Sequence, residues 1–379
     1  MKKVLIFYAS YGGGHLSAAR SIKEYIDTNY KDTEVLIVDC IEYINRALNK
    51  VSTKAFVEIS KKAHWAWKQL YNSAEGGTFS KISNTANRVM AVKLNKLIQE
   101  VQPDLIISTH MFSSQMCSVL KKKNRISCKL ATVLTDYVPH NQWLINYPVI
   151  DYFFVAHEGM RDALIEHGIS KANIFATGIP LSNRFLASYD KEKVLTDFGL
   201  EMGKTTILFF AGGEYGFGKE GTFNILKSLI EHFPNMQVIA IAGRNVKMKK
   251  QFEELVSETN ASKTVKVLEY TNKVPELMSV SDLVITKPGG LTTTESIASG
   301  LPIIVINPIP GHEESNALFV EDNGIGIWIR KNDNVEEKLR SILKSPEKIK
   351  QMKIQARLTA KRNSTKDICV VMLGKPNKN

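Results

Sequence analysis

Short apolar runs of strand length alternate with longer segments of helical pattern over most of the chain. Twelve such runs stand at residues 4–9, 35–39, 105–109, 130–135, 152–156, 174–177, 206–211, 238–242, 265–268, 283–286, 303–307 and 325–329. They are mostly continuous series of Val, Ile, Leu and Phe rather than alternations of apolar and polar residues, which indicates strands covered on both faces. Helical segments between the strands predict parallel βαβ units and therefore an α/β fold.

The charged stretch 182–204 has no long apolar run and divides the predicted strands into two equal sets. We therefore expect two Rossmann-like domains whose parallel sheets face each other across a cleft, joined by a linker near residues 185–204. The first domain is assigned to residues 1–190, the second to residues 200–355, and a C-terminal helix and tail to residues 356–379. Because ligands of open parallel sheets bind beyond the carboxyl ends of the strands, the site is expected in that cleft.

Composition narrows the class of protein. The chain has 379 residues, of which 44% are apolar and 23% charged. That is ordinary globular composition, so disordered and fibrous proteins are excluded. No apolar run reaches the roughly 18 residues that a membrane-spanning helix needs. The four cysteines are widely spaced and show no metal-binding pattern, which favours free thiols in a reducing cytoplasm.

A glycine-rich turn follows the first predicted strand. Gly12, Gly13 and Gly14 stand between that strand and a helix, and His15 follows directly. Such a turn lets backbone N–H groups approach a ligand at the positive end of the helix, and His15 could take a hydroxyl proton there. The spacing matches neither the dinucleotide nor the P-loop pattern. The alternative is a tight turn with a histidine that has no chemical role.

The second half carries several turns of the kind that bind phosphates. Lys287, Pro288, Gly289 and Gly290 lead from a predicted strand into a helix that begins with threonines, a pattern that suits a phosphate or diphosphate. Glu295 could accept hydrogen bonds from sugar hydroxyls or simply complement the helix dipole. Further candidates at strand ends are Gly212, Gly213, Arg244, Asn245, Thr292, Glu313 and Glu314. Together they predict that this domain binds a nucleotide diphosphate.

These motifs, taken together, resemble glycosyltransferase family 28. The residues that carry the resemblance are Gly12 to His15, Thr135-Asp136 with His140 and Trp143, Gly243-Arg244-Asn245, Lys287 to Gly290 with Glu295, and the run from Pro103 to His110. The pattern is most similar to the glycolipid branch, which comprises monogalactosyldiacylglycerol synthases and bacterial processive diacylglycerol glucosyltransferases, and it covers roughly residues 3–330. The resemblance implies a GT-B fold, a UDP-sugar donor (glucose or galactose), a diacylglycerol or glycosyl-diacylglycerol acceptor, and inversion to a β-linkage.

The resemblance also implies roles for individual residues. His15 is our first choice for the base, and Asp136, at the end of a predicted strand in the same domain, is the second. This chain departs from the plant members, which carry an acid shortly before the glycines where it has Ser10-Tyr11. The resemblance places Glu313 and Glu314 near the sugar hydroxyls, Glu295 near the ribose, and Thr271 and Asn272 near uracil. The acceptor and phosphate loops would contain Gly12, Gly13, Gly14, His110, His140 and Trp143. Neither a metal nor a cofactor is expected, since phosphate-binding turns and a helix N-terminus can stabilise the departing UDP.

Positive charge is concentrated in one segment of the chain, and the lipid acceptor implied by the resemblance suggests a role for it. The net charge is +12, and residues 43–96 hold ten Lys or Arg against two acidic residues. We expect Lys61, Lys62, Trp65 and Lys68 to contact an anionic membrane surface, with the protein peripheral on the cytoplasmic face of the membrane. The apolar residues at helical spacing there could instead face the core, and no nucleic-acid-binding signature accompanies the charge.

Three other functions fit the same pattern in part. The first is a lipid-linked peptidoglycan N-acetylglucosaminyltransferase, which a screen of donors would distinguish. The second is a GT-B-fold sugar-nucleotide epimerase, against which the basic segment counts. The third is a sensor that binds a nucleotide sugar without turnover.

Overall fold

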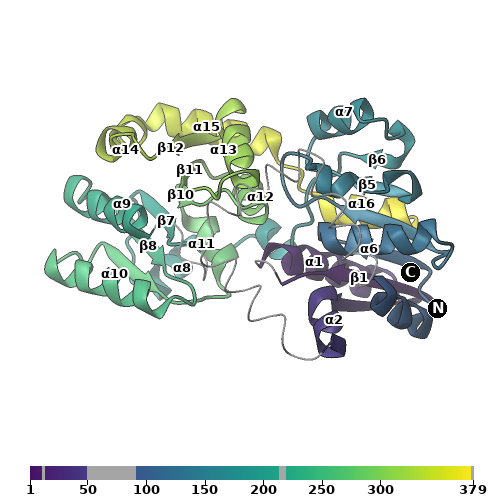
Figure 1. Ribbon diagram of the computed structural model, residues 1–379. Helices are drawn as coiled ribbons and strands as arrows, with labels where there is room; N and C mark the ends of the chain where they lie inside the picture. The colour runs from purple at the N-terminus through teal and green to yellow at the C-terminus, as the bar shows by residue number, and fades with distance from the viewer. Residues whose placement is uncertain (11–12, 49–90, 213–218, 377–379) are drawn as a thin grey trace. The chain divides into compact units, whose positions relative to one another are not determined.

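The computed structural model describes residues 1–10, 13–48, 91–212 and 219–376. The chain divides into two compact units, one made of residues 1–182 and 361–379 and the other of residues 183–360. Each unit contains a six-stranded sheet in which every strand pair is parallel, with helices between the strands (Figure 1). The predicted α/β fold with two Rossmann-like domains is confirmed.

The first unit has the strand order β2-β1-β3-β4-β5-β6. Its strands are β1 (Lys2–Tyr8), β2 (Thr33–Asp39), β3 (Leu105–Ser108), β4 (Lys129–Val133), β5 (Tyr152–Phe154) and β6 (Ile174–Phe175). Its helices are α1 (Gly14–Asn29), α2 (Cys40–Leu48), α6 (Met111–Lys122), η1 (Asn141–Leu144), η2 (Tyr147–Val149), α7 (Glu158–Glu166), η3 (Lys171–Asn173) and α16 (Ser364–Leu373). Residues 91–101 are also helical.

The second unit has the strand order β12-β11-β10-β7-β8-β9. Its strands are β7 (Thr206–Phe210), β8 (Gln237–Ile241), β9 (Val265–Leu268), β10 (Leu283–Thr286), β11 (Ile303–Ile306) and β12 (Gly326–Ile329). Its helices are η4 (Asn183–Leu186), α8 (Lys191–Asp197), α9 (Lys219–His232), α10 (Val246–Glu258), α11 (Val274–Val280), α12 (Gly290–Ala298), α13 (His312–Asp322), α14 (Val335–Leu343) and α15 (Pro346–Thr359).

All twelve predicted strands are present, and burial explains why their pattern was readable. Every residue of β3, β8, β10 and β11 is buried, as expected for strands with helices on both faces of the sheet. In the first unit Ile22 and Ile26 of α1 pack on Val4 and Ile6 of β1. In the second unit Phe252 of α10 packs into the corresponding core cluster.

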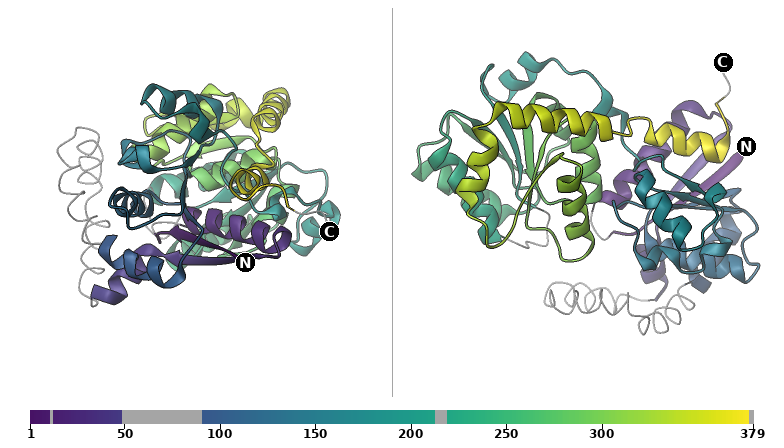
Figure 2. Two further views of the ribbon diagram at one scale, coloured as in Figure 1. Left: turned by 90° about the vertical axis from the view of Figure 1, so that its right-hand side faces the viewer. Right: turned by 90° about the horizontal axis from the view of Figure 1, so that it is seen from above.

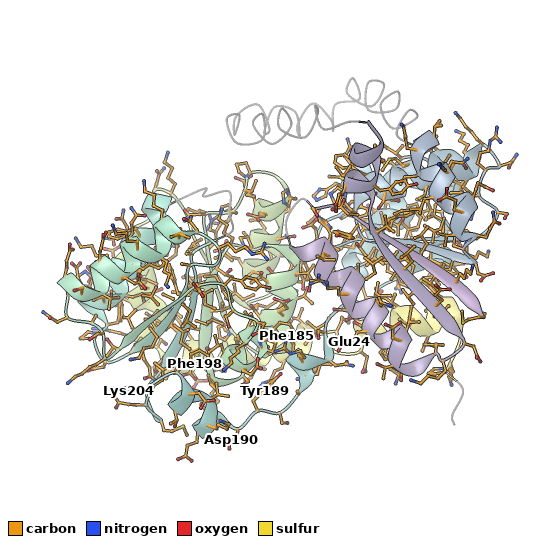
Figure 3. All side chains as sticks on the ribbon, turned by 90° about the horizontal axis from the view of Figure 1, so that it is seen from below. Glu24, Phe185, Tyr189, Asp190, Phe198 and Lys204 are labelled. Carbon is orange, nitrogen blue, oxygen red and sulfur yellow. The ribbon has the colours of Figure 1, made fainter. Side chains whose placement is uncertain are left out.

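The expected linker is largely ordered structure of the second unit. Residues 183–186 form η4 and residues 191–197 form α8, and both helices pack against α11. Asp190 caps α8 by accepting a hydrogen bond from the backbone N–H of Lys193 at 3.0 Å. Figure 3 shows Tyr189, Asp190 and Phe198 along this segment. Short amphipathic helices in a charged stretch leave no long apolar run, so the sequence pattern did not indicate them.

The C-terminal helix belongs to the first unit rather than to a separate tail. α16 lies beside α1 (Figure 2) and buries Ile368 and Cys369 completely in the core of that unit. The hydroxyl of Tyr30, which follows α1, donates a hydrogen bond to the carbonyl of Gly374 at 2.6 Å. The division at 355–356 was therefore wrong, because an amphipathic pattern predicts a helix but does not identify the distant partner that buries it.

The two segments through which the chain leaves and re-enters the first unit are bound to each other. Thr365 Oγ1 accepts a hydrogen bond from Leu181 N at 2.8 Å and donates one to Leu181 O at 2.7 Å. Gly178, with φ of +93°, lies against Lys361 so closely that a Cβ atom on it would approach Lys361 Cβ to 2.5 Å. The chain therefore needs glycine at this position.

Candidate active site

The carboxyl ends of β1 and β3 form the topological switch point of the first sheet. From β1 the chain continues to β2 on one side, whereas β3 lies on the other side of β1. The turns after β1 and β3 therefore leave in opposite directions, and such a divergence is where open parallel sheets bind ligands. His15 follows β1 and His110 follows β3, and their ring centroids are 4.4 Å apart.

Thr109 holds His15 at two points. The His15 ring nitrogen Nδ1 is 2.7 Å from the carbonyl oxygen of Thr109, and the Thr109 hydroxyl donates to the carbonyl of His15 at 2.9 Å. Because a carbonyl oxygen can only accept a hydrogen bond, Nδ1 carries the ring proton. In the neutral ring Nε2 then keeps the lone pair, which is the form that can accept a proton.

His110 is a neutral imidazole beside this group. It is only 3% exposed, and its Nδ1 accepts a hydrogen bond from the backbone N–H of Phe112 at 3.1 Å, at the start of α6. Burial lowers the pKa of His110 well below its usual range; neighbouring His15 acts in the same direction and Asp136 opposes both. His110 therefore adds no positive charge next to His15 at neutral pH.

The loop after β4 brings together three of the predicted residues. Asp136 Oδ2 lies 3.8 Å from Nε2 of His140, and both side chains are largely buried. Trp143, 2% exposed, is part of η1, which packs against α6. The acid that we considered as an alternative base is thus close to His140, and its field reaches His110.

The glycine turn after β1 is described in part. Gly13 is the residue before α1 and Gly14 is its first residue, and a Cβ atom on Gly13 would meet nothing within 4 Å. Gly12 lies outside the described residues, as do Gly213 in the second unit and the four predicted membrane contacts, Lys61, Lys62, Trp65 and Lys68.

An acidic side chain that the sequence analysis missed reaches the end of β1 from the neighbouring strand. The Ser10 hydroxyl donates a hydrogen bond to Oδ2 of Asp39, the last residue of β2. Asp39 Oδ1 also accepts hydrogen bonds from the backbone N–H groups of Ile41 and Glu42, both at 3.0 Å. A carboxylate is therefore present beside Ser10, although residues 10 and 11 themselves are not acidic.

The second sheet has an equivalent switch point between β7 and β10. Gly212 follows β7 with φ of +94°, and Lys287 follows β10 with its Cε atom 3.2 Å from where a Cβ atom on Gly212 would lie. Burial lowers the pKa of Lys287, and the carboxylate of Glu313 opposes that shift. A partly desolvated ammonium group thus lies where two backbone turns diverge.

The two predicted glutamates of α13 both accept hydrogen bonds from the turn that precedes them. Glu313 Oε2 accepts from the backbone N–H of Ile309 at 2.6 Å, and Glu314 Oε2 accepts from that of Gly311 at 3.0 Å. Asn316, which the sequence analysis did not single out, donates to the carbonyl of Pro288 at 2.9 Å. α13 therefore fixes both its own entry turn and the turn after β10.

Helix α12 begins at the second switch point. Gly289 is its N-cap, Gly290 its first residue, and half-buried Thr292 lies in its first turn. Glu295 keeps some surface, yet the protein atoms packed around its carboxyl group withhold water and raise its pKa to about 8. Glu295 is therefore mostly protonated at neutral pH in this structure.

The remaining donor-site candidates lie after β8 and β9. The guanidinium carbon of Arg244 is 4.9 Å from the centroid of the exposed Tyr270 ring. Asn245 accepts a hydrogen bond from Met248 N at 3.0 Å and so caps α10, and Thr271 Oγ1 accepts from Lys273 N at 3.1 Å. Asn245 and Thr271 thus shape the turns that present Arg244 and Tyr270.

Metal sites and membrane-spanning helices are both absent from the described parts of the chain. No group of three or more His, Cys, Asp or Glu residues within them could hold a metal ion. In the same ranges, every helix is too short or too polar to cross a bilayer.

Two Rossmann-like units, each with a switch point in a six-stranded parallel sheet, define the GT-B class of fold. Residues 15–181 match the sequence model of the family described as monogalactosyldiacylglycerol (MGDG) synthase, and residues 216–369 match that of the glycosyltransferase family 28 C-terminal domain. A processive diacylglycerol beta-glucosyltransferase of Staphylococcus epidermidis is 31% identical over 374 residues, which cover 98% of this chain and 92% of that protein. The chain belongs to glycosyltransferase family 28, in its glycolipid branch.

Solved structures agree on the fold. The crystal structure of Acinetobacter baumannii MurG has a TM-score of 0.65 at 13% identity, covering 98% of this chain and 99% of the other. The UDP-GlcNAc 2-epimerase from Neisseria meningitidis, bound to UDP-GlcNAc, has a TM-score of 0.66 at 15% identity, covering 98% and 100%. At such identities the likeness shows a shared GT-B architecture, and the reaction has to be inferred from the side chains at the site.

Proposed function

We propose that this enzyme transfers a hexose, glucose or galactose, from a UDP-sugar to diacylglycerol and forms a β-linked membrane glycolipid. The names of the matching family and of the Staphylococcus epidermidis relative support a diacylglycerol acceptor. The residues at the two switch points support the chemistry, since one unit offers a base and the other a set of groups for a diphosphate.

The single observation that carries the proposal is the orientation of His15. Its Nδ1–H is held by the carbonyl of Thr109 at 2.7 Å, so the lone pair is on Nε2. In the reaction Nε2 takes the proton of the acceptor hydroxyl while the hydroxyl oxygen attacks the anomeric carbon. The bond from that carbon to the UDP oxygen breaks on the opposite face, which inverts the configuration.

The departing UDP needs compensation for its developing negative charge. The N-terminus of α12 offers backbone N–H groups with a partial positive charge, and Lys287 offers an ammonium group beside Gly212. We assign the diphosphate of UDP to the N-terminus of α12 and Lys287, and the ribose to Glu295. The uracil ring is assigned to the surroundings of Arg244 and Thr271. This assignment requires no metal ion.

We also propose that the enzyme works as a peripheral protein on the cytoplasmic face of the membrane. The support is the lipid acceptor together with the excess of basic residues between positions 43 and 96. Anionic headgroups would attract that segment and bring the first unit to its acceptor.

The deciding experiment is a transfer assay with diacylglycerol in liposomes that contain anionic lipid. UDP-glucose, UDP-galactose and UDP-N-acetylglucosamine are supplied separately, and lipid products are identified by mass spectrometry. We expect a hexosyl-diacylglycerol from one of the first two donors. A product only on a peptidoglycan lipid precursor with UDP-N-acetylglucosamine, or epimerisation of the donor without lipid product, would overturn the proposal.

A further inference from the structure

Thr135, like Thr109, makes a polar contact with the His15 ring. Its hydroxyl oxygen lies 3.1 Å from Nδ1 of His15, and the side chain is 3% exposed. Thr135 follows β4, whereas Thr109 follows β3, so two neighbouring strands converge on one ring nitrogen. The neutral ring has only one proton to share between these two contacts.

The direction of each hydrogen bond follows from elementary chemistry. The carbonyl of Thr109 can only accept, so Nδ1 is the donor, and the hydroxyl of Thr135 must accept from the same N–H. The Nδ1–H group is therefore shared between two oxygens. When Nε2 takes a proton from the acceptor alcohol, Nδ1–H becomes more acidic and both contacts strengthen.

We propose that Thr135 is a positioning residue of the reaction, an inference that rests on the proposed function. It acts through His15: together with the Thr109 carbonyl it fixes the Nδ1–H tautomer and stabilises the imidazolium that forms during transfer. The role that a carboxylate has in many histidine-dependent enzymes is thus divided between two neutral oxygens. His110, a neutral ring whose centroid is 4.4 Å away, adds no positive charge beside the His15 ring.

The test compares two substitutions at position 135 with a control in β4, the strand that Thr135 follows. Thr135→Val removes the hydroxyl at nearly constant volume, and Thr135→Ser retains it. Thr132→Val is the control, because Thr132 is also fully buried and its hydroxyl is bound to Ser114 at 2.7 Å, away from His15.

We expect kcat to fall about tenfold in Thr135→Val with KM for the UDP-sugar unchanged, and to stay within about twofold in Thr135→Ser. Thr132→Val should lower the unfolding temperature but retain kcat. Wild-type kcat in Thr135→Val, or an equal loss in Thr135→Ser and Thr135→Val, would overturn the inference. Both outcomes presuppose an active wild-type enzyme, which is the separate test of the proposed function.

A measurement without substrate keeps the inference testable even if Thr135→Val does not fold. In wild-type protein with ¹⁵N-labelled histidines, the His15 signal is assigned by its loss in His15→Gln. For the wild type we expect the ¹⁵N chemical shifts of a neutral His15 ring with its proton on Nδ1. In Thr135→Ser, which retains the hydroxyl, at most a part of the population should change to the Nε2–H tautomer. A wild-type ring protonated on Nε2 alone would overturn the inference whether or not the enzyme transfers sugar.

Discussion

The side chain of Lys287 lies where a side chain on Gly212 would begin, at the switch point of the second sheet. A Cβ atom on Gly212 would lie 3.2 Å from Cε and 4.0 Å from Nζ of Lys287. The φ of Gly212 is +94°, a conformation that residues with side chains rarely adopt. Both the backbone of this turn and the position of the lysine therefore depend on the absence of a side chain.

Gly212→Ala should destabilise the second unit by about 1–3 kcal/mol, because alanine is strained at this φ, and should also weaken UDP binding, because Lys287 must move. Thermal unfolding and calorimetric titration with UDP measure the two effects. Gly203→Ala is the matched control, since Gly203 has φ of +81° and a Cβ atom on it would meet nothing within 4 Å. Unchanged UDP affinity in Gly212→Ala would remove Lys287 from the donor site.

Replacing His15 by alanine should lower transfer at least 100-fold, the range expected for loss of a general base. UDP affinity should stay nearly unchanged, because the groups assigned to UDP all lie in the second unit. The liposome assay and a UDP titration check this pair of results, with Asp136→Asn as the comparison. Full activity in His15→Ala would transfer the role of base to Asp136 or to another group.

Glu295 should make the stability of the second unit depend on pH. Its pKa, raised to about 8 by burial, exceeds the ordinary value of 4.5, so between these pH values the folded state retains a proton that the unfolded chain loses. The free energy of unfolding therefore falls as pH rises through this window. Glu295→Gln should flatten the dependence in thermal unfolding at pH 5 to 9, whereas Glu258→Gln, at an exposed position of α10, should leave it unchanged.

The basic segment should govern membrane binding. Lys61→Glu with Lys62→Glu is expected to reduce co-sedimentation with vesicles containing anionic lipid, and added salt should reduce binding of the wild type. Lys348→Glu with Lys350→Glu, which replaces two exposed charges on α15, is the control for net charge. Equal binding of the double variant and the wild type would place the membrane contact elsewhere.

Transfer should persist when divalent cations are removed. The charges assigned to UDP stabilisation belong to Lys287 and to the N-terminus of α12, neither of which needs a metal ion. The check is the liposome assay in EDTA against the same assay with Mg²⁺ or Mn²⁺. A loss of activity in EDTA that either ion restores would contradict the assignment.

The central strands were predictable because β3, β8, β10 and β11 are buried on both faces, which leaves continuous apolar runs in the sequence. Such burial can be recognised from a short stretch of sequence, and so can glycines and polar residues at the ends of strands. The helix α8 and the place of α16 were not predictable in the same way. Packing of α16 on α1 brings Gly374 to Tyr30, and the sequence of neither segment identifies the other as its packing partner.

The same limit separates the predicted site residues from the missed ones. His15 stands out because three glycines precede it, but Thr109 and Thr135 are ordinary last residues of apolar runs. Their contacts with His15 span 94 and 120 positions and exist only because β3 lies between β1 and β4. The sequence does show a threonine directly before His110 and another directly before Asp136. Only the order of the strands in the sheet reveals that both lie beside His15.

The mutual hydrogen bonds of Thr365 and Leu181 bear on how the first unit is completed. The second unit is one uninterrupted segment, whereas the first needs residues from both ends of the chain, including the buried Ile368 and Cys369. The second unit can therefore complete its fold from one continuous stretch of chain, whereas the unit that contains His15 lacks part of its core until residues 361–374 join it. The unit whose chain begins first is thus the one that is completed last.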